Sequence, residues 1–393
     1  GKSLYETDDS FATRRQLAEL PRRPGRGRML VTPFGYFLRA GQCIYRSSDL
    51  SGWVCSHQTR HLPWLMDEMD FWFDADSQRG YVYVSEYSSK DTREEHKLVR
   101  GLFRAGKDPE WTTVFTLFSR DEQASDPNKF LFAGRHIHLV KVDPYTGHVW
   151  LGTGDADEDS MIMYSDDQGA TFRRLGFGSQ EYRTLAFWFT AGFVYWNMDT
   201  GTPPQKIFRV ARLDLANRQT LTPVLGEGMN EPGVTYYVVV SDNSNRFPVS
   251  VGQKYIETGM RHLDGLHKVL AVDDELYDFK TAVADLTNDS HWSVLPAVTA
   301  TGDEVFLMSH SAEGFARFRT RDPRARVFGI KERHDGQVDV QELLTAETWR
   351  EGYERARLNP VVQDADGNVY FNGVGTRHGD SVYKSRLIWR DFR

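Results

Sequence analysis

Pairs of short apolar runs, each pair joined by a polar turn, recur along the whole chain. In one of them, aromatic and β-branched residues fill 71–73 and 81–84, and Gly80 ends the polar stretch between them. Runs of this kind bounded by turn residues predict two strands of a hairpin. About seven such hairpins follow one another at intervals of roughly 40 to 70 residues, near or somewhat above the period of propeller blades. The hairpins cover residues 30–38, 71–84, 139–151, 185–196, 234–267, 297–308 and 361–371.

This repeat predicts an all-β fold, a single β-propeller built from four-stranded antiparallel blades. Seven blades are the first choice and six the alternative, because residues 233–290 are hard to assign to strands. We expect the propeller to occupy residues 29–393, after an N-terminal extension over 1–28. Two segments favour helices instead. These are residues 11–20 and residues 345–356, the second with Thr345 as a plausible N-cap.

The composition agrees with this architecture. The 393 residues include 10 Trp, 17 Tyr, 24 Phe and 33 Gly, types that suit half-buried strands and many turns. The formal net charge of -7 lacks the basic footprint of a nucleic-acid-binding protein. No apolar run approaches the ~18 residues of a membrane span, and no signal peptide pattern is present.

Two cysteines, Cys43 and Cys55, flank a turn over residues 47–53. If the hairpin is symmetric they face each other, and a cross-strand disulfide would imply an oxidising compartment. The alternative, which the sequence favours, is a pair of reduced thiols in a half-buried sheet. Among cellular locations, the secreted or periplasmic ones are slightly favoured.

The segment Ser165–Phe172 has the pattern Ser-x-Asp-x-Gly-x-Thr-aromatic, called an Asp box or BNR repeat. Gly169 can adopt a positive φ, and the Asp167 carboxylate can accept hydrogen bonds from the turn. The ring of Phe172 can be buried between sheets. We expect this turn to join the third and fourth strands of a blade and to be structural.

Strand order predicts where functional residues gather. In a propeller, the starts of the first strands and the ends of the second strands meet at one end of the channel, where loops carry function. His136 and His138 are two apart on one strand and therefore face the same side. Candidate catalytic residues are His136, His138, Tyr182, Arg183, Asp155 and Asp199. Candidate substrate-binding residues are Arg135, Glu86, Tyr87, Trp196, Asn197, Tyr236, His310, Arg357, Arg377 and His378.

These residue types perform acid–base catalysis and bind anions. Simpler interpretations stay open: the two histidines can be a hydrogen-bonded pair at a strand end, and Arg135 and Arg183 can form ordinary ion pairs.

No metal or other cofactor is predicted. The alternating carboxylates of residues 155–159 resemble the start of a calcium loop, but Ser160 stands where glycine is required. A solvated acidic loop is the favoured interpretation, with Ca²⁺ as the alternative. His136-x-His138 is only a fragment of a zinc site.

The chain resembles the sialidase-like Asp-box propellers. Within this family, residues 135–199 resemble poorly characterised bacterial members. The matching segments are 135–138, 143–147, Trp150, 153–155, the Asp box, 178–184 and 195–199. The resemblance implies a carbohydrate-related role, with a polysaccharide as the expected partner. The Arg-Ile-Pro motif of true sialidases is missing, and Arg22-Arg23-Pro24 is a poor substitute, which argues against cleavage of sialic acid. Other propellers of similar architecture are polysaccharide lyases that act on uronic acids through His, Tyr and Arg.

We therefore expect a carbohydrate-active enzyme that cleaves an acidic, uronic-acid-containing poly- or oligosaccharide, as a lyase or a glycoside hydrolase. As a lyase it would use Arg183 on the uronate, His136 or His138 as base, and Tyr182 or another histidine as acid. As a hydrolase it would use Asp155 and Asp199. The alternatives are a non-catalytic glycan-binding propeller, with Trp64, Tyr87 and Trp196 stacking on sugars, and a protein-interaction scaffold.

Overall fold

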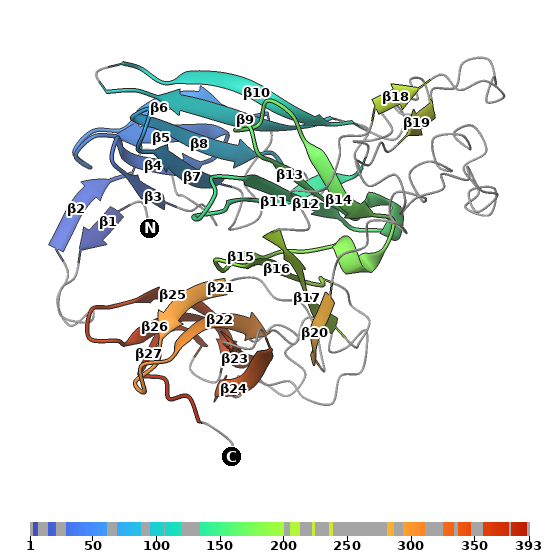
Figure 1. The fold of residues 1–393 in the computed structure, drawn as a ribbon. Coiled ribbons are helices and arrows are strands. Elements are labelled where there is room, and N and C mark those ends of the chain that lie inside the picture. The colour runs from blue at the N-terminus through green and yellow to red at the C-terminus, as the bar shows by residue number, and fades with distance from the viewer. Residues whose placement is uncertain are drawn as a thin grey trace. The chain divides into compact units, whose positions relative to one another are not determined.

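The fold is all-β, as predicted (Figure 1). The computed structural model describes residues 3–6, 15–20, 29–60, 69–87, 95–105, 107–118, 134–199, 205–212, 222–224, 236–238, 281–286, 294–310, 325–333, 337–346, 357–376 and 379–390. These residues lie almost entirely in strands and in the turns between them. Within this part of the chain, no helix is both long and apolar enough to cross a bilayer.

The chain divides into two compact units, and the first consists of Gly1–Ser179 and Asn217–Asp278. It contains three four-stranded antiparallel sheets, each formed by strands consecutive in sequence. The inner strand β7 contacts β3 on one side and β11 on the other, which is how adjacent blades pack. The strands are β3 (Met29–Thr32), β4 (Gly35–Ala40), β5 (Cys43–Ser47), β6 (Val54–Gln58), β7 (Met69–Asp74), β8 (Arg79–Ser85), β9 (His96–Phe103), β10 (Glu110–Leu117), β11 (His136–Val142), β12 (Val149–Gly154), β13 (Met161–Ser165) and β14 (Arg173–Phe177).

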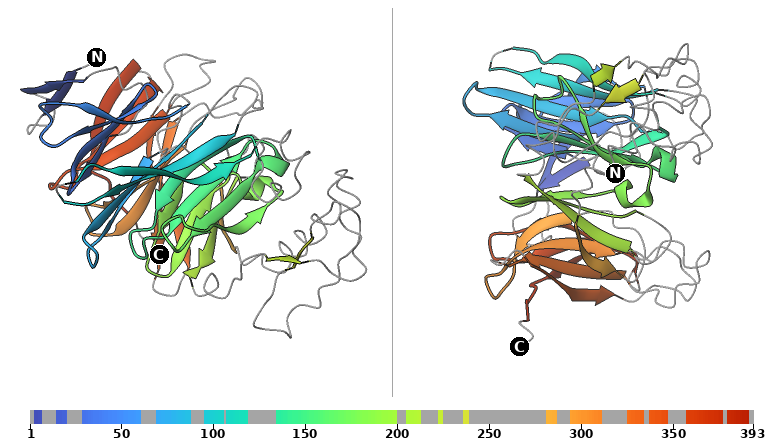
Figure 2. Two further views of the ribbon diagram at one scale, coloured as in Figure 1. Left: turned by 90° about the horizontal axis from the view of Figure 1, so that it is seen from above. Right: turned by 45° about the vertical axis from the view of Figure 1, so that its right-hand side comes forward.

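The second unit, Gln180–Ala216 and Phe279–Arg393, contains two further four-stranded sheets and one three-stranded sheet, all antiparallel. Figure 2 shows the sheets from two further sides. The strands are β15 (Phe187–Phe189), β16 (Phe193–Asn197), β17 (Gln205–Ala211), β20 (Thr281–Leu286), β21 (Val294–Val298), β22 (Glu304–His310), β23 (Ala325–Glu332), β24 (Val338–Ala346), β25 (Arg357–Gln363), β26 (Val369–Thr376) and β27 (Gly379–Ser385).

The described residues thus form six sheets of blade type. Most of the predicted hairpin at 234–267 lies outside the described residues, so the choice between seven and six blades stays a prediction. The boundary between an extension and the propeller at residue 29 also stays a prediction.

Two predicted helices are wrong where the structure describes them. Arg15–Glu19 forms β2, which pairs antiparallel with β1 (Ser3–Glu6). Thr345 lies in β24 and pairs with Arg326 of β23, so it is not an N-cap. Residues 11–14 and 347–356 lie outside the described residues. In both cases, pairing with a neighbouring strand satisfies the backbone groups that a helix would have satisfied internally, and so overrides local helix propensity.

Buried apolar side chains fill the space between the second and third sheets. Ile137, Leu151 and Met163 are completely inaccessible to solvent and belong to one hydrophobic cluster. Burying each such side chain contributes about 1.5–3 kcal/mol. The ring of Phe172 lies 5.0 Å from that of Phe115 in β10, measured between centroids, so its predicted burial between sheets is confirmed.

The predicted hydrogen bonds of the Ser165–Phe172 turn are present. This turn joins β13 to β14, the third and fourth strands of their sheet. Thr171 donates its backbone N–H and its hydroxyl to the Asp167 carboxylate at 2.8 and 2.6 Å. The Gly169 N–H donates to the Ser165 hydroxyl at 2.7 Å, and Gly169 has a φ of +90°. The Gln168 carbonyl of the turn also accepts hydrogen bonds from Tyr83 and Arg100 of the neighbouring sheet, so the turn is held both internally and from outside.

Cys43 of β5 and Cys55 of β6 form a disulfide, with their Cα atoms 5.8 Å apart. The interpretation favoured from the sequence, two reduced thiols, is therefore wrong. In the β5–β6 ladder Cys43 pairs with Gln58 and Cys55 pairs with Tyr45, so the two cysteines do not lie directly opposite each other. The bridge therefore runs diagonally between the two strands.

Candidate functional site

The third sheet of the first unit brings two histidines and one carboxylate together at its edge. His136 and His138 lie on β11, and Asp155 follows directly after β12. His136 pairs with Gly154, so the end of β12 places Asp155 beside the start of β11. The register shifts between Ile137 and Leu139, so His138 lies at the shift, as in a β-bulge. A bulge re-aims the side chain it carries.

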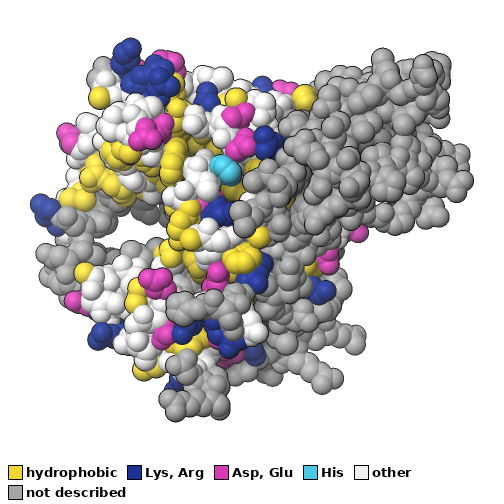
Figure 3. All heavy atoms as spheres, viewed as in Figure 1, with side chains coloured by type: hydrophobic (Ala, Val, Ile, Leu, Met, Phe, Trp, Pro, Cys, Tyr) yellow, Lys and Arg dark blue, Asp and Glu magenta, His cyan; other side chains and the backbone are white. Residues whose placement is uncertain are grey.

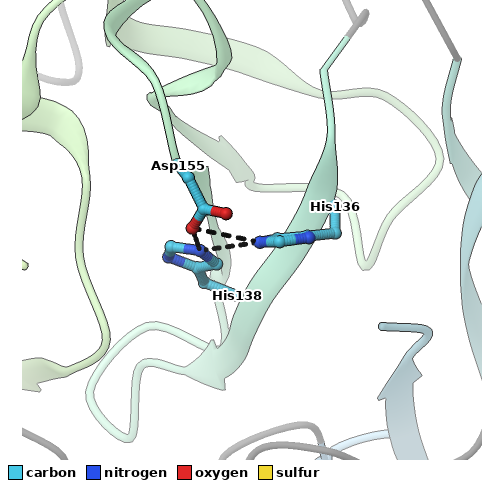
Figure 4. A group of neighbouring side chains, drawn as sticks. All are labelled: His136, His138 and Asp155. Atoms are coloured by element: carbon cyan, nitrogen blue, oxygen red, sulfur yellow. Dashed lines mark hydrogen bonds and ion pairs between the residues drawn. The ribbon is translucent and has the colours of Figure 1, made fainter. Parts of the chain in front are cut away.

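The three side chains point toward one another (Figure 4). The Nε2 atoms of His136 and His138 are 3.1 Å apart. Oδ1 of Asp155 lies 3.3 Å from Nε2 of His138 and 3.4 Å from Nε2 of His136. These three atoms therefore form a nearly equilateral triangle, and we call His136, His138 and Asp155 the His-Asp cluster.

The cluster combines two buried imidazoles with a more exposed carboxylate. His136 and His138 are 1% and 2% exposed, whereas the Asp155 side chain is 31% exposed. Burial lowers the pKa of His136 to about 4, against the opposing hydrogen bond with Asp155, so this imidazole is neutral at pH 7. Burial alone would raise the pKa of Asp155, but hydrogen bonds with the two imidazoles outweigh it and the pKa is lowered. The carboxylate is therefore ionised.

Two neighbours complete the surroundings of the cluster. The Nη1 atom of Arg135 lies 2.8 Å from Oδ2 of Asp155, which leaves Oδ1 for the imidazoles. The Tyr87 ring lies on His136, with centroids 4.2 Å apart. Both simpler interpretations from the sequence are thus present as contacts, a hydrogen-bonded histidine pair and an ordinary arginine ion pair.

The cluster carries three atoms of the kinds that hold a metal ion, all within 4.8 Å of one another. The predicted strand order places all three residues at the same end of the sheet, but it did not identify them as a set of metal ligands. The signal was available in the strand order, because a residue just after β12 must lie beside a residue at the start of β11. What the spacing could not show is the distance between the side-chain atoms.

A second group of predicted residues meets in the second unit. Asp199 accepts hydrogen bonds from Arg183 Nε and Nη2 at 3.1 and 3.0 Å, and its backbone N–H donates to the Arg183 carbonyl at 2.8 Å. Tyr182 ends the short 3₁₀ turn η3 (Gln180–Tyr182) and is 5% exposed. The guanidinium of Arg183 is thus oriented by a largely buried carboxylate and keeps partial exposure, 23% for its side chain.

Three predicted substrate-binding residues have their polar atoms engaged within the protein. Trp196 is completely buried and donates its indole N–H to the Glu181 carbonyl at 2.8 Å. Asn197 is completely buried and donates to the Met198 carbonyl at 3.1 Å. Glu86, which is 3% exposed, accepts the backbone N–H groups of Arg60 and Lys97. Of the aromatic residues proposed to stack on sugars, Tyr87 is therefore better placed than Trp196.

The remaining predicted residues are described only in part or not at all. Tyr236 lies in β19 (Tyr236–Val238), which pairs with β18 (Thr222–Val224) in a two-stranded sheet, so it does not begin an inner strand of a four-stranded sheet as expected. His310 ends β22 and Arg357 begins β25. Their side chains lie outside the described part of the structure, as do Trp64, Arg377 and His378.

The acidic segment after Asp155 forms a short turn of its own. Residues Asp157–Asp159 make the 3₁₀ turn η2, and the Ser160 hydroxyl donates to the Ala156 carbonyl at 2.7 Å. The Asp155 carboxylate faces the imidazoles and Arg135. The calcium alternative for residues 155–159 stays a prediction.

No protein-family model matches this chain, and no curated protein sequence does. Among solved structures, an ulvan lyase of polysaccharide lyase family PL25 is similar at 9% identity and a TM-score of 0.31, over 92% of this chain and 82% of the lyase. An α-L-arabinofuranosidase from Clostridium thermocellum gives 10% identity and a TM-score of 0.30, over 80% and 92% of the two chains. A xylan β-1,4-xylosidase from Bacillus halodurans gives 10% and 0.29, over 80% and 54%. Similarity this low carries no argument about activity.

Proposed function

We propose that this chain is a carbohydrate-active enzyme that cleaves glycosidic bonds in an acidic, uronic-acid-containing poly- or oligosaccharide. The observation that carries the proposal is the His-Asp cluster, in which two buried imidazoles share one ionised carboxylate held by Arg135. Buried titratable groups gathered at strand ends, with shifted pKa values and loops beside them, are typical of catalytic sites. The sequence resemblance of residues 135–199 to sialidase-like Asp-box propellers supports a carbohydrate substrate.

β-Elimination is the chemistry that the site supports best. A guanidinium such as that of Arg135 pairs with the uronate carboxylate and makes the C5 proton more acidic. The C5 proton then passes to a base at the His-Asp cluster. This base is either one of the two imidazoles or another group that is bound by the imidazoles. The electron pair of the C5–H bond forms the C4=C5 double bond. The C4–O bond breaks with its electrons on the glycosidic oxygen, which takes a proton from a general acid at the same site.

The hydrolase alternative is supported less well. It requires a protonated carboxylic acid to protonate the leaving group. Burial raises the pKa of Asp155, but the hydrogen bonds with His136 and His138 outweigh it and lower the pKa. Asp155 therefore suits the role of a base or a ligand rather than that of the acid, and Asp199 accepts two hydrogen bonds from Arg183.

Local guanidinium groups, rather than a basic surface, would attract an acidic glycan. Acidic and basic side chains are interspersed among the coloured residues of Figure 3, and the net charge of the chain is -7. The Cys43–Cys55 disulfide supports a location in an oxidising compartment, where extracellular polysaccharides are met.

The proposal is tested by incubating the purified chain with a panel of acidic polysaccharides. We expect new reducing ends together with ultraviolet absorbance from an unsaturated uronide. Reducing ends without that absorbance would instead identify a hydrolase. His138→Gln should lower the rate by about 100-fold or more, and His148→Gln, in the turn between β11 and β12, is the matched control.

Absence of new reducing ends across the whole panel would overturn the enzyme proposal. If the chain then retained a glycan on an affinity gel, the glycan-binding alternative would replace it. In that case His138→Gln would change only the retention.

A further inference from the structure

No single placement of hydrogens turns all three contacts within the His-Asp cluster into hydrogen bonds. If Nε2 of His138 carries the hydrogen, that hydrogen serves either His136 Nε2 or Asp155 Oδ1. The His136 lone pair then faces a carboxylate oxygen 3.4 Å away. If both Nε2 atoms carry hydrogens, both N–H groups can donate to Oδ1 of Asp155, but the two donors then lie 3.1 Å apart with no hydrogen bond between them. Neither arrangement of two neutral imidazoles satisfies all three contacts.

A cation at the centre of the triangle satisfies them all. Zinc binds imidazole nitrogen and carboxylate oxygen at about 2.0–2.2 Å, and tetrahedral geometry at that distance holds neighbouring ligand atoms about 3.3–3.5 Å apart. The measured separations are 3.1, 3.3 and 3.4 Å. An ion seated just outside the plane of the three atoms would therefore lie about 2 Å from each of them.

We propose that His136, His138 and Asp155 form a binding site for a divalent transition-metal ion, with Zn²⁺ as the ion whose ligand chemistry and geometry fit best. Two imidazoles and one carboxylate are a ligand set of catalytic rather than structural zinc sites, because they leave a fourth position open. Calcium fits poorly, because it prefers six to eight oxygen ligands at longer distances.

The surroundings meet the further needs of such a site. Arg135 binds Oδ2 of Asp155 and so fixes Oδ1 toward the imidazoles, which is the task of a second layer of hydrogen bonds around a metal. The two histidines are buried and the Asp155 side chain is 31% exposed, so the carboxylate is the most solvent-accessible of the three ligands. The bulge at His138 changes the local backbone geometry and so sets the spacing between the two imidazoles.

The binding claim stands apart from glycan cleavage, whereas its use in catalysis rests on the proposed function. A bound zinc ion acts as a Lewis acid toward a substrate oxygen or lowers the pKa of a water molecule. With both Nε2 lone pairs engaged, the histidines would position the ion instead of removing the C5 proton themselves.

The test is a titration of untagged, chelator-treated full-length chain with Zn²⁺ alone, followed by calorimetry. We expect one ion per chain with an apparent Kd of about 1 μM or below. The cobalt-substituted protein should show the visible absorption of tetrahedral Co²⁺, which a site formed by surface carboxylates would not give.

Asp155→Asn and His138→Ala should each weaken zinc binding by about 100-fold or more, whereas the control His148→Asn should leave it unchanged. Asp155→Asn is the safer variant because its side chain is partly exposed. Thermal unfolding of each metal-free variant checks that it folds. A wild-type chain that binds no zinc at micromolar concentration, or variants that bind it as well as wild type, would overturn the metal site.

The two proposals fail separately. Zinc binding that depends on the cluster, in a chain without activity on any polysaccharide, would leave the metal site standing and remove the proposed function. Glycan cleavage in a chain that binds no zinc would leave the proposed function standing and remove the metal site.

Discussion

Arg135 holds one oxygen of Asp155 while the other oxygen of that carboxylate faces two imidazoles. The guanidinium Nη1 lies 2.8 Å from Oδ2, and Oδ1 lies 3.3 Å from His138 Nε2. Both partners are partly exposed, so the ion pair contributes at most about 1 kcal/mol to folding. Its larger effect is to fix which way the carboxylate points.

Arg135→Met should therefore lower the affinity for zinc by about 10–100-fold, because the ligand stays but loses its orientation. The unfolding temperature should change little. Competition with a colorimetric chelator measures the affinity. Arg104→Met removes another exposed ion pair, with Glu110, and is the control. Equal affinities in wild type and Arg135→Met would exclude the orienting role.

Arg183→Lys should raise KM for an acidic glycan by about tenfold and change kcat less. Lysine keeps the charge but loses the planar fork that can pair with a carboxylate. Arg183 also holds Asp199 through two nitrogens, which one ammonium cannot reproduce. Steady-state kinetics decides, with Arg173→Lys, in the exposed ion pair with Asp166, as the control. An unchanged KM would remove Arg183 from substrate binding.

Replacing Cys43 and Cys55 together by serine should lower the free energy of unfolding by about 3 kcal/mol, from the loop-closure entropy of a cross-link between residues 12 apart. Denaturant titration measures the change. A reducing agent should destabilise wild type by a similar amount and leave the double variant unaffected. If reduction shifts both proteins equally, the effect does not come from this disulfide.

Asp167→Asn should cost about 1–2 kcal/mol at pH 7, because charge-assisted hydrogen bonds in the turn are lost. Burial raises the pKa of Asp167, but hydrogen bonds from Thr171 and Ser165 outweigh it, and the pKa is lowered from 3.8. A carboxylate with a lowered folded-state pKa stabilises the fold above its unfolded pKa, and this contribution is lost as the pH falls through the folded pKa.

The difference between Asp167→Asn and wild type should accordingly be constant from about pH 7 to pH 5 and shrink below about pH 4. Urea unfolding across that range measures it, with Asp76→Asn on an exposed turn as the control. A difference that grew toward low pH would have the wrong sign for this carboxylate.

Gly147→Ala should destabilise the third sheet by about 2 kcal/mol or more. Gly147 has a φ of +73°, and a Cβ atom there would lie 2.7 Å from Cε2 of Trp72 in the neighbouring sheet. Gly52→Ala is a matched control, because its Cβ would meet nothing within 4 Å. Thermal unfolding of the two variants compares their stabilities. Similar unfolding midpoints would show that the Trp72 side chain moves away from the new Cβ atom at little cost.

Hairpin chemistry made the fold predictable. Turn residues such as those at 364–367 mark where β25 and β26 join, and the structure places that turn between them, with a φ of +81° at Gly367. The helices expected at residues 11–20 and at Thr345 failed where they are described, because strand pairing is a contact between distant segments that local propensity does not contain.

The site was predictable to the level of which strand ends meet. Alternation placed His136 and His138 on one side, and strand order placed Asp155 beside them. The triangle of ligand atoms depends on the bulge at His138 and on side-chain rotamers, neither of which has a sequence signature here. The complete burial of Trp196 and Asn197 was missed for a related reason, since the pattern does not show which face the next sheet covers.

The bulge at His138 links the chemistry of this site to the dynamics of its strand. Because β11 pairs with β12 on both sides of His138, any ligand that fixes the two imidazoles also opposes local opening of that ladder. Amide hydrogen exchange along Ile137–Val142 should therefore slow when zinc is added, and β11 would report occupancy of the site without any substrate.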